Sequence, residues 1–417
     1  MGIEIRPAAS DEMDQFGLMG AYSYGGSFGD GPDNITSSSN RPEWTLCAFD
    51  GSTMATAFSA FPFTMRANGK AMSYAGISGV GTRPEYRRQG LLRRIMTQAF
   101  SDMRDRQQSV AGLWASQAAI YQRYGFSINN FKRKYEVDSV NVRFNENDTE
   151  LLKVSRHLPG EVMDLVKGLY REFVLNRMSY LHRSTALWMN NVFEEGEDGP
   201  VYVAVAYDSD EPKAYVAYTL RAGKVNDRAR PQEIKILDFS WLTSQAYRSI
   251  WQYLGLHDLV GRITWETAPI DDPAYEMFQE PRLLHTEDQE GAWFRVIDVA
   301  AALENRGYFE EGEIVIEVFG DDIADWNNGK CKLEVSQGEA IAQSTKKSPD
   351  LKIGIKALGS LFTGMRRARE LAAWGLIEGN KNSISIADDL FVTHHAPHCP
   401  DPVSYTHLRA HETVLDL

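Results

Sequence analysis

The chain has 417 residues, of which 43% are hydrophobic and 11% aromatic, and its formal net charge is −13 at pH 7. This length and composition predict two to four folded domains with sizeable cores and exclude a disordered protein. The negative charge argues against general nucleic-acid binding, which requires a basic surface, and favours cationic small molecules or basic peptides as partners.

Cysteine use and hydropathy favour a cytoplasmic location. The three cysteines Cys47, Cys331 and Cys399 include no CxxC pair, so we expect no disulfide framework. The N-terminal sequence MGIEIRPA has no apolar signal region, and Arg6 stands where a myristoylation motif requires Ser or Thr. No apolar run approaches the length of a membrane-spanning helix.

The first 71 residues predict the beginning of a sheet with one helix. Residues 25–40 form a polar loop rich in Gly and Ser, and a loop of this length is either a substrate lid or a disordered connector. The expected elements are a strand at Ile3–Arg6, a helix from Asp11, and a hairpin of Trp44–Phe49 and Thr53–Phe63 that turns at Asp50-Gly51.

Residues 72–126 predict a strand, a loop, a helix, a second strand and a short helix in direct succession. The strands are expected at Ser73–Thr82 and Val110–Ala115, and the short helix at Ile120. The main helix begins at Gly90, where apolar residues start to recur at helical spacing. These apolar residues are Leu91, Leu92, Ile95, Met96, Ala99, Phe100 and Met103.

The loop before the main helix favours a phosphate site. Its first turn presents free N–H groups and the positive end of the helix dipole, and Gly90 has no Cβ to exclude a ligand. A pyrophosphate fits such a site, and arginines add charge-assisted contacts. The alternative is a solvated basic helix face without a ligand. The arginines gathered here are Arg83, Arg87, Arg88, Arg93 and Arg94.

This loop resembles the coenzyme A loop of the Gcn5-related N-acetyltransferases (GNAT), which reads Arg or Gln, two residues, Gly, one residue, then Gly or Ala. Here it reads Arg87-Arg88-Gln89-Gly90-Leu91-Leu92. Leu92 departs from the general pattern but is similar to the enhanced-intracellular-survival (Eis) branch, whose loop ends Gly-Leu-Leu. A second motif agrees, because Ser116 ends the next strand and Tyr121 follows in an Ile-Tyr-x-Arg-aromatic-Gly-aromatic segment. The resemblance covers nearly the whole chain.

The resemblance implies a fold and a cofactor site. The fold is α/β (α+β), with tandem GNAT domains in which two parallel strands of a mixed sheet splay apart, followed by a sterol-carrier-like α+β domain. Gly79 and Gly81 would leave room for a ligand at the strand edge, or mark a bulge without function. The residues implied to bind acetyl-CoA are Val80, Gly81, Thr82, Arg88, Gln89, Gly90, Leu91, Leu92, Arg93, Ser116 and Gln117.

The resemblance also implies the catalytic groups. Tyr121 is implied as the general acid that protonates the leaving thiolate. The implied base is the C-terminal carboxylate, which here belongs to Leu417. Residues 403–417 read VSYTHLRAHETVLDL, which resembles a vector or adaptor read-through. We therefore expect a non-native tail that carries this carboxylate away from the site.

The resemblance implies a catalytic GNAT domain at 1–150, a degenerate second GNAT-like domain at 151–290, a sterol-carrier-like domain at 291–402, and the tail at 403–417. The second domain lacks an Arg-Arg-x-Gly loop, so we expect no pyrophosphate site there. Its expected elements are a helix at Glu161–Val192, a hairpin of Val201–Tyr207 and Ala214–Arg221, strands at Glu233–Leu242 and Arg262–Glu266, and a helix at Ser244–Leu256. Those of the third are strands at Glu313–Phe319 and Lys330–Val335 around a turn at 325–329, and a helix at Met365–Trp374.

We expect a cytoplasmic N-acetyltransferase that uses acetyl-CoA to acetylate a primary amine of an aminoglycoside-like polyamine or a lysine side chain. The alternatives are another acyl or peptidyl transferase, similar to N-myristoyltransferases, and a non-enzymatic lipid or coenzyme A carrier. A homohexamer is implied by resemblance alone. The histidines at 394, 395 and 398 with Cys399 match no zinc-finger spacing, so we expect no metal and no Cys-His nucleophile.

Overall fold

The computed structural model describes residues 2–25, 40–145, 150–196 and 198–401. Their contacts divide the chain into two compact units. The first unit combines Met1–Asn129, Met178–Ala186 and Ala292–Leu417, and the second combines Asn130–Arg177 and Leu187–Gly291. No helix in these described ranges is both long and apolar enough to cross a membrane.

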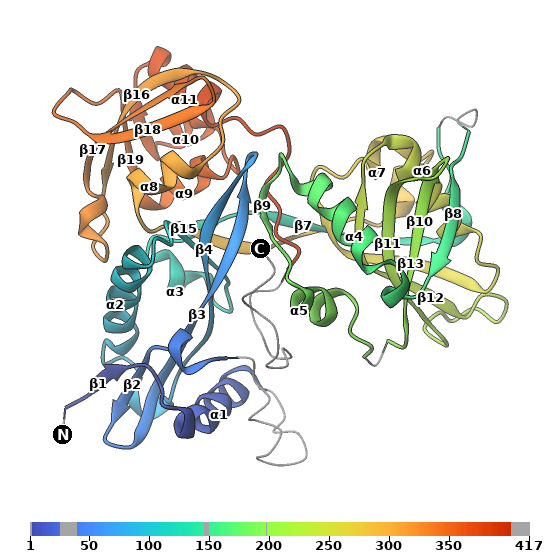
Figure 1. The fold of residues 1–417 in the computed structure, drawn as a ribbon, viewed down its shortest axis with the longest axis horizontal. Helices are drawn as coiled ribbons and strands as arrows, with labels where there is room; N and C mark the ends of the chain where they lie inside the picture. Colours follow the sequence, from blue (N-terminus) through green and yellow to red (C-terminus); the bar gives the residue numbers. More distant parts are fainter. Residues whose placement is uncertain (1, 26–39, 146–149, 197, 402–417) are drawn as a thin grey trace. The chain divides into compact units, whose positions relative to one another are not determined.

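The first unit contains a mixed sheet in the order β1-β2-β3-β4-β5-β15-β6, with β9 paired to β3 (Figure 1). Only β4 and β5 pair in parallel within it; the other pairs are antiparallel. The strands are β1 (Glu4–Arg6), β2 (Cys47–Asp50), β3 (Thr53–Ala67), β4 (Lys70–Thr82), β5 (Val110–Trp114), β6 (Ser127–Ile128), β9 (Met178–Leu181) and β15 (Ala292–Val296), and the helices are α1 (Met13–Tyr24), α2 (Leu91–Asp105) and α3 (Ala118–Gln122).

The two parallel strands separate as predicted. β4 and β5 are paired only from Tyr74↔Val110 to Gly76↔Gly112, although β4 continues to Thr82. On its other edge, β4 has one extra residue against β3 between Ser78 and Gly81, and Gly79 takes a left-handed φ of 61°. This bulge turns the end of β4 just where β5 leaves it, because an extra residue bends a strand.

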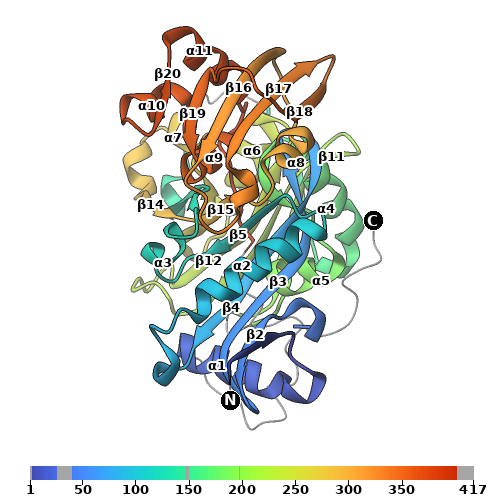
Figure 2. The same cartoon turned by 90° about the vertical axis from the view of Figure 1, so that its left-hand side faces the viewer.

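Helix α2 covers one face of this sheet (Figure 2). Its buried residues are Leu91, Ile95, Met96, Ala99, Phe100 and Met103, which confirms the predicted helical stripe. They form one core with residues from β2, β3, β4 and β5. Because the apolar stripe faces the sheet, the arginines of α2 are left on its outer side and its N-terminus lies at the open end of the strand pair.

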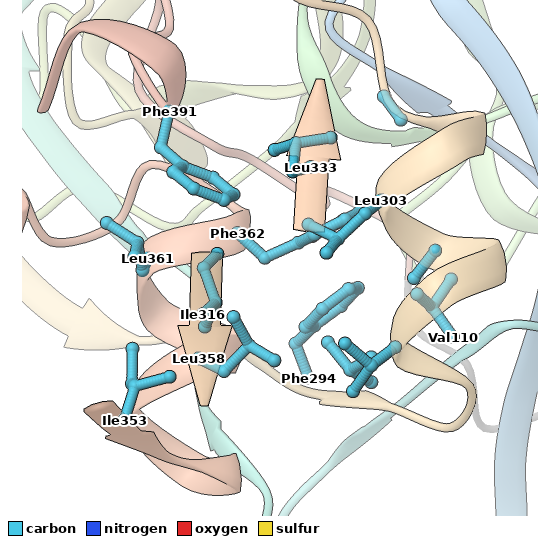
Figure 3. Close-up of a cluster of buried hydrophobic side chains, with 14 of the residues drawn as sticks. Val110, Phe294, Leu303, Ile316, Leu333, Ile353, Leu358, Leu361, Phe362 and Phe391 are labelled. Atoms are coloured by element: carbon cyan, nitrogen blue, oxygen red, sulfur yellow. The ribbon is translucent and has the colours of Figure 1, made fainter. Parts of the chain in front are cut away.

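The C-terminal domain adds a second sheet in the order β18-β17-β16-β19-β20. Its core is continuous with the other face of the first sheet, where Val110 and Phe294 meet Ile316 and Phe362 (Figure 3). The predicted helix at Met365–Trp374 is shorter than expected. The elements are β16 (Gly312–Phe319), β17 (Gly329–Ser336), β18 (Glu339–Ser344), β19 (Leu351–Gly354), β20 (Ile377–Gly379), α8 (Val299–Asn305), α9 (Ile355–Phe362), α10 (Ala368–Ala373) and α11 (Lys381–Leu390).

The second unit repeats the plan of the first. Its sheet runs β14-β7-β13-β12-β11-β10-β8, and β12 and β13 form the parallel pair that α6 connects. The predicted hairpin, strands and α6 are confirmed with small shifts of their ends. The elements are β7 (Phe131–Asp138), β8 (Lys153–His157), β10 (Val201–Asp208), β11 (Glu211–Arg221), β12 (Gln232–Trp241), β13 (Val260–Pro269), β14 (Glu287–Glu290), α4 (Pro159–Val174), α6 (Ser244–Gly255) and α7 (Ala274–Met277).

The single helix predicted over Glu161–Val192 is wrong in its middle, because α4 ends at Val174 and helical turns return only at α5 (Thr185–Leu187) and Trp188–Val192. Between them, Met178–Leu181 becomes β9, which pairs with β3 of the first unit's sheet. Each residue of β9 is buried. An apolar stretch of this length suits a helix or a strand, and the edge of β3 decides in favour of the strand.

Two strands pair with a different sheet from the one that precedes them in the sequence. β7 follows the first sheet in sequence but pairs with β13 and β14 of the second, while β15 follows the second sheet and pairs with β5 and β6 of the first. The boundaries expected at 150 and 290 stay a prediction, but these pairings place 131–138 and 292–296 on the opposite side of them. Strand pairing at long range is not visible in local patterns.

Candidate functional site

A pocket of about 490 Å³ opens where β4 and β5 separate. It is formed by the end of β4, the loop before α2, the first turn of α2, and the segment from Ser116 to Tyr124. All residues predicted to bind a cofactor line it except Gln89, whose amide donates instead to the carbonyl of Glu85 at 3.1 Å. The pocket residues anticipated from sequence are Val80, Gly81, Thr82, Arg88, Gly90, Leu91, Leu92, Arg93, Ser116, Gln117 and Tyr121.

The N-terminus of α2 is open to this pocket. Gly90 is the N-cap residue with a left-handed φ of 75°, and no side chain caps the helix. A Cβ placed on Gly90 would meet no heavy atom of the described chain within 4 Å. Arg88, two residues earlier, also has a left-handed φ of 62°. The first backbone N–H groups of α2 therefore face an open space, which is the geometry of an anion site.

The pocket wall is positively charged. Arg87, Arg88, Arg93 and Arg123 line it, and no acidic residue belongs to its described lining. Arg87 is oriented by its Nε, which donates to the carbonyl of Thr82 at 3.1 Å. Arginines next to uncapped helix N–H groups favour phosphate oxygens, because both supply donors and positive charge.

Two of the five predicted arginines lie outside the lining. Arg94 donates from Nη2 to the carbonyl of Ile3 at 3.2 Å, and Arg83 lies 4.0 Å from the carboxylate of Glu85. The loop therefore divides its arginines between the pocket and the surrounding structure. The sequence alone does not show which arginines line the pocket, because this depends on how the loop and the first turn of α2 are oriented.

Tyr121 lies on α3, lines the pocket and is 4% exposed. Burial raises the pKa of its hydroxyl, and the nearby Tyr24 adds to this, whereas a hydrogen bond with Ser116 lowers the pKa. The hydroxyl thus keeps its proton throughout the neutral range. A protonated phenol beside Ser116 is able to donate to an anion formed in the pocket.

The sequence reasoning missed the wall contributed by α1. Ser23 and Tyr24 line the pocket, and the Tyr24 hydroxyl donates to the carbonyl oxygen of Val80 at 3.1 Å. A Cβ on Gly81 would lie 2.4 Å from Oγ of Ser23, so Gly81 is required by the close approach of α1 to β4. No signal in the sequence pairs these segments. Arg123, in contrast, belongs to the quoted tyrosine motif and was detectable there.

The last described residue, Asp401, lies beside the end of β5. Asp401 forms a buried ion pair with Arg183 at 2.9 Å, and its backbone carbonyl accepts a hydrogen bond from Nε1 of Trp114 at 3.2 Å. Trp114 is the last residue of β5, two positions before Ser116. Leu417, the predicted source of the basic carboxylate, lies outside the described residues.

The histidines near the end of the described chain are used in packing. His394 stacks on Phe309 with ring centroids 3.7 Å apart, and His398 packs against Tyr180 at 5.4 Å. Cys399 is buried, and burial raises its thiol pKa. In the ranges that the structure describes, no group of three or more His, Cys, Asp or Glu residues is arranged to hold a metal ion.

In the second unit, the start of the helix that joins the two parallel strands is capped. Thr243 caps α6 by accepting from the backbone N–H of Ala246 at 3.1 Å. Trp241, the last residue of β12, packs its ring 4.9 Å from that of Phe173 and 4.8 Å from that of Tyr247. The start of α6 is therefore capped, unlike that of α2, and the absence of a pyrophosphate site in this copy stays a prediction.

Comparison with known families gives three matches. An Acetyltransferase (GNAT) domain family matches residues 4–129, a second Acetyltransferase (GNAT) domain family matches 179–296, and a Sterol carrier protein domain family matches 299–400. The three matches follow the order of domains that the sequence predicts.

Two proteins of similar sequence are named N-acetyltransferases. The chain is 28% identical over 312 residues to the N-acetyltransferase Eis of Mycobacterium tuberculosis, covering 72% of this chain and 73% of that protein. It is 27% identical over 325 residues to an uncharacterized N-acetyltransferase of Streptomyces coelicolor, covering 76% and 78%.

Solved structures show the same fold. A GCN5-related N-acetyltransferase from Anabaena variabilis superposes with a TM-score of 0.84 at 21% identity, covering 96% of this chain and 100% of that chain. Eis1 from Mycobacterium abscessus superposes with a TM-score of 0.80 at 22% identity, with the same coverage.

Proposed function

We propose, from the premise that this chain belongs to the Eis-type GNAT N-acetyltransferases, that it transfers the acetyl group of acetyl-CoA to a primary amine by direct attack within a ternary complex. The observation that carries the proposal is the uncapped N-terminus of α2 at Gly90, which opens into an arginine-lined pocket ending at Tyr121. Acetyl-CoA supplies an activated thioester to this pocket.

The described residues fit such a donor. The backbone N–H groups after Gly90, with Arg88 and Arg93, would hold the pyrophosphate, since the room over Gly90 is unobstructed. The end of β4 from Val80 to Thr82 would hold the pantetheine arm, because β5 has left that edge. Of the other predicted residues, Leu91, Leu92, Ser116 and Gln117 also line the pocket.

The proposed reaction requires three functions from the protein: removal of a proton from the acceptor amine, stabilisation of the oxyanion and protonation of the leaving thiolate. The acceptor ammonium, with a pKa of about 10.4 for a lysine-like amine, must lose a proton before it attacks. Backbone N–H groups near Val80 would stabilise the oxyanion that the attack creates. Tyr121 would donate its proton to the departing thiolate, which it is able to do because its raised pKa keeps it protonated.

The base is assigned to the segment that follows Asp401. The ion pair of Asp401 with Arg183 and the bond from Trp114 hold the chain at the end of β5. The base proposed here is a C-terminal carboxylate, which in this chain belongs to Leu417 and lies outside the described residues.

A lipid carrier is the second candidate, and the packing of the third domain disfavours it. The interior between its sheet and α9 is filled by side chains such as Ile316, Leu333, Leu358 and Phe362 (Figure 3). A cavity of about 100 Å³ lies beside α10 and α11. Ligand pockets typically hold roughly 300 Å³ or more, so this one is too small for a lipid.

The experiment measures thiol release from acetyl-CoA, with an aminoglycoside or a lysine peptide as acceptor. It compares the present chain with one cut after Asp401 and given a terminal Phe. A matched control carries Phe-Gly-Gly instead, which keeps the aromatic ring but moves the carboxylate. We expect activity in the Phe chain and less in the control. Equal activity in all three would reject the carboxylate base, and thiol release only from a longer acyl-CoA would favour another acyltransferase.

We also propose a cytoplasmic homohexamer on the same family basis. Light scattering of the purified chain measures the mass of the assembly directly. A monomer would reject the hexamer without affecting the chemistry proposed for the pocket.

A further inference from the structure

We propose that α9 of the sterol-carrier-like domain positions Tyr121 for catalysis, acting through residues 122–127 and together with Arg295. The inference rests on the general-acid role proposed above for Tyr121. It assigns a task in the reaction to a domain that contributes no residue to the pocket lining described above.

Helix α9 contacts the tyrosine segment at three successive points. Lys356 Nζ donates a hydrogen bond to Oε1 of Gln122 on α3. Ile355 packs so closely that its Cγ2 would lie 3.1 Å from a Cβ placed on Gly125. A Cβ on Gly359 would lie 2.7 Å from Oγ of Ser127. One face of α9 therefore follows the chain from the end of α3 into β6.

Arg295, on β15, packs against the turn at Gly125. Its side chain is fully buried, and Nη2 lies 2.7 Å from both carboxylate oxygens of Asp321 in the third domain. Its Nη1 lies 2.0 Å from the position of a Cβ on Gly125. Asp321 is itself held by the backbone N–H of Ala324 at 3.0 Å and by Nδ2 of Asn327 at 2.9 Å. The third domain thus fixes the guanidinium that lies against Gly125.

The turn at Gly125 is bonded directly to Tyr121. The backbone carbonyl of Tyr121 accepts from the N–H of Tyr124 at 2.9 Å and from the N–H of Phe126 at 3.3 Å. The ring of Tyr121 also packs edge-on against Phe126, with centroids 6.0 Å apart, and Phe126 is fully buried. A shift of Gly125 or Phe126 therefore moves Tyr121, and small displacements of a catalytic group lower the rate strongly.

The test combines Ile355→Ala with a matched control, Leu361→Ala. Both residues are buried on α9 and belong to the same core, but Ile355 also packs against Gly125 of the tyrosine segment. We expect both variants to lower the unfolding temperature. Only Ile355→Ala should lower kcat, by roughly tenfold, with an unchanged KM for acetyl-CoA. Equal kcat values in the two variants would overturn the proposal.

A double-variant cycle separates this role from a general structural one. In the Tyr121→Phe background, Ile355→Ala should leave kcat unchanged, because the group it positions is already absent. The same loss of kcat in both backgrounds would overturn the proposal. If Tyr121→Phe alone left kcat unchanged, the proposed general acid itself would be rejected, and that outcome is visible without any α9 variant.

A second pair of substitutions tests the contact of α9 with α3 at two exposed residues, where a change is less damaging to folding. Lys356 and Gln122 are both exposed, so Lys356→Glu should fold while it loses the present bond. We expect a lower kcat for Lys356→Glu and recovery in the Lys356→Glu/Gln122→Lys variant, where the reversed pair restores the contact. Failure of the second substitution to restore kcat would overturn the part assigned to this contact.

Discussion

The hydroxyl of Tyr24 donates a hydrogen bond to the carbonyl oxygen of Val80 across 56 residues of sequence, at a distance of 3.1 Å. This bond lies at the end of β4, on the edge that β5 leaves open. A strand-like ligand on that edge would use the same carbonyl as an acceptor. Tyr24 therefore competes with such a ligand, or yields when the ligand binds.

We predict that Tyr24→Phe tightens acetyl-CoA binding by roughly threefold, because a typical hydrogen bond that no longer competes contributes about 0.5–1.5 kcal/mol. Isothermal titration calorimetry measures the affinity. Tyr22→Phe is the matched control, since Tyr22 lies on the same helix and is 63% exposed. Weaker binding in Tyr24→Phe would show instead that the hydroxyl contacts the ligand.

Gly90→Glu should weaken acetyl-CoA binding on the order of 100-fold, because a carboxylate facing a phosphate costs several kcal/mol. Gly90→Asn is the control, since Asn tolerates the left-handed φ of 75° that Gly90 adopts. We expect the Asn variant to fold and to bind far better than the Glu variant. Similar affinities in the two variants would move the phosphate site away from α2.

Tyr121→Phe should retain acetyl-CoA binding and lower kcat by roughly 100-fold if it removes a general acid. Burial raises the pKa of Tyr121 above its usual 10, so the active, protonated form persists through the whole neutral range. Activity that depends on this proton is lost only when the pH rises through the elevated pKa. The pH profile of kcat should therefore show no fall due to Tyr121 below about pH 10, and a Tyr121-dependent fall near neutral pH would contradict this.

Asp272 in the second unit should make folding depend on pH. Its Oδ1 accepts from the hydroxyls of Tyr135 and Tyr247 at 3.0 and 2.7 Å, while Oδ2 has no hydrogen-bond partner among the described residues. Burial raises its pKa from 3.8 to about 6. The neutral carboxyl is favoured in the folded state, so its stabilisation is complete below pH 3.8 and is lost as the pH rises through 6.

Asp272→Asn carries no ionisable group at this position and lacks this dependence. Between pH 4 and 7.5 we expect the native chain to lose about 2 kcal/mol of unfolding free energy relative to the Asn variant, since one pKa unit corresponds to about 1.4 kcal/mol. Urea unfolding of both chains at the two pH values measures the difference. Parallel pH dependence in the two chains would contradict the raised pKa.

The sequence predicted the first unit's central motif well because its signals are local. The stripe of α2, the helix start at Gly90 and the pocket residues near Tyr121 all lie within about 50 residues and follow helical or turn rules. The part of the pocket formed by Ser23 and Tyr24 was missed, because it depends on α1 crossing the end of β4. The acceptor and the base remain proposals.

The sequence by itself determined the helical stripe of α2, the strands that flank it, the acidic balance of the chain and the arginine-glycine loop, since these depend on composition and on neighbours within a few turns. Only the tertiary structure decided that β9 is a strand rather than helix, that β7 and β15 change sheets, and that Arg295 reaches Gly125. Each of these depends on burial and on the pairing of backbone groups between distant segments. Local propensity is too weak to determine such choices, so the partner at long range decides them.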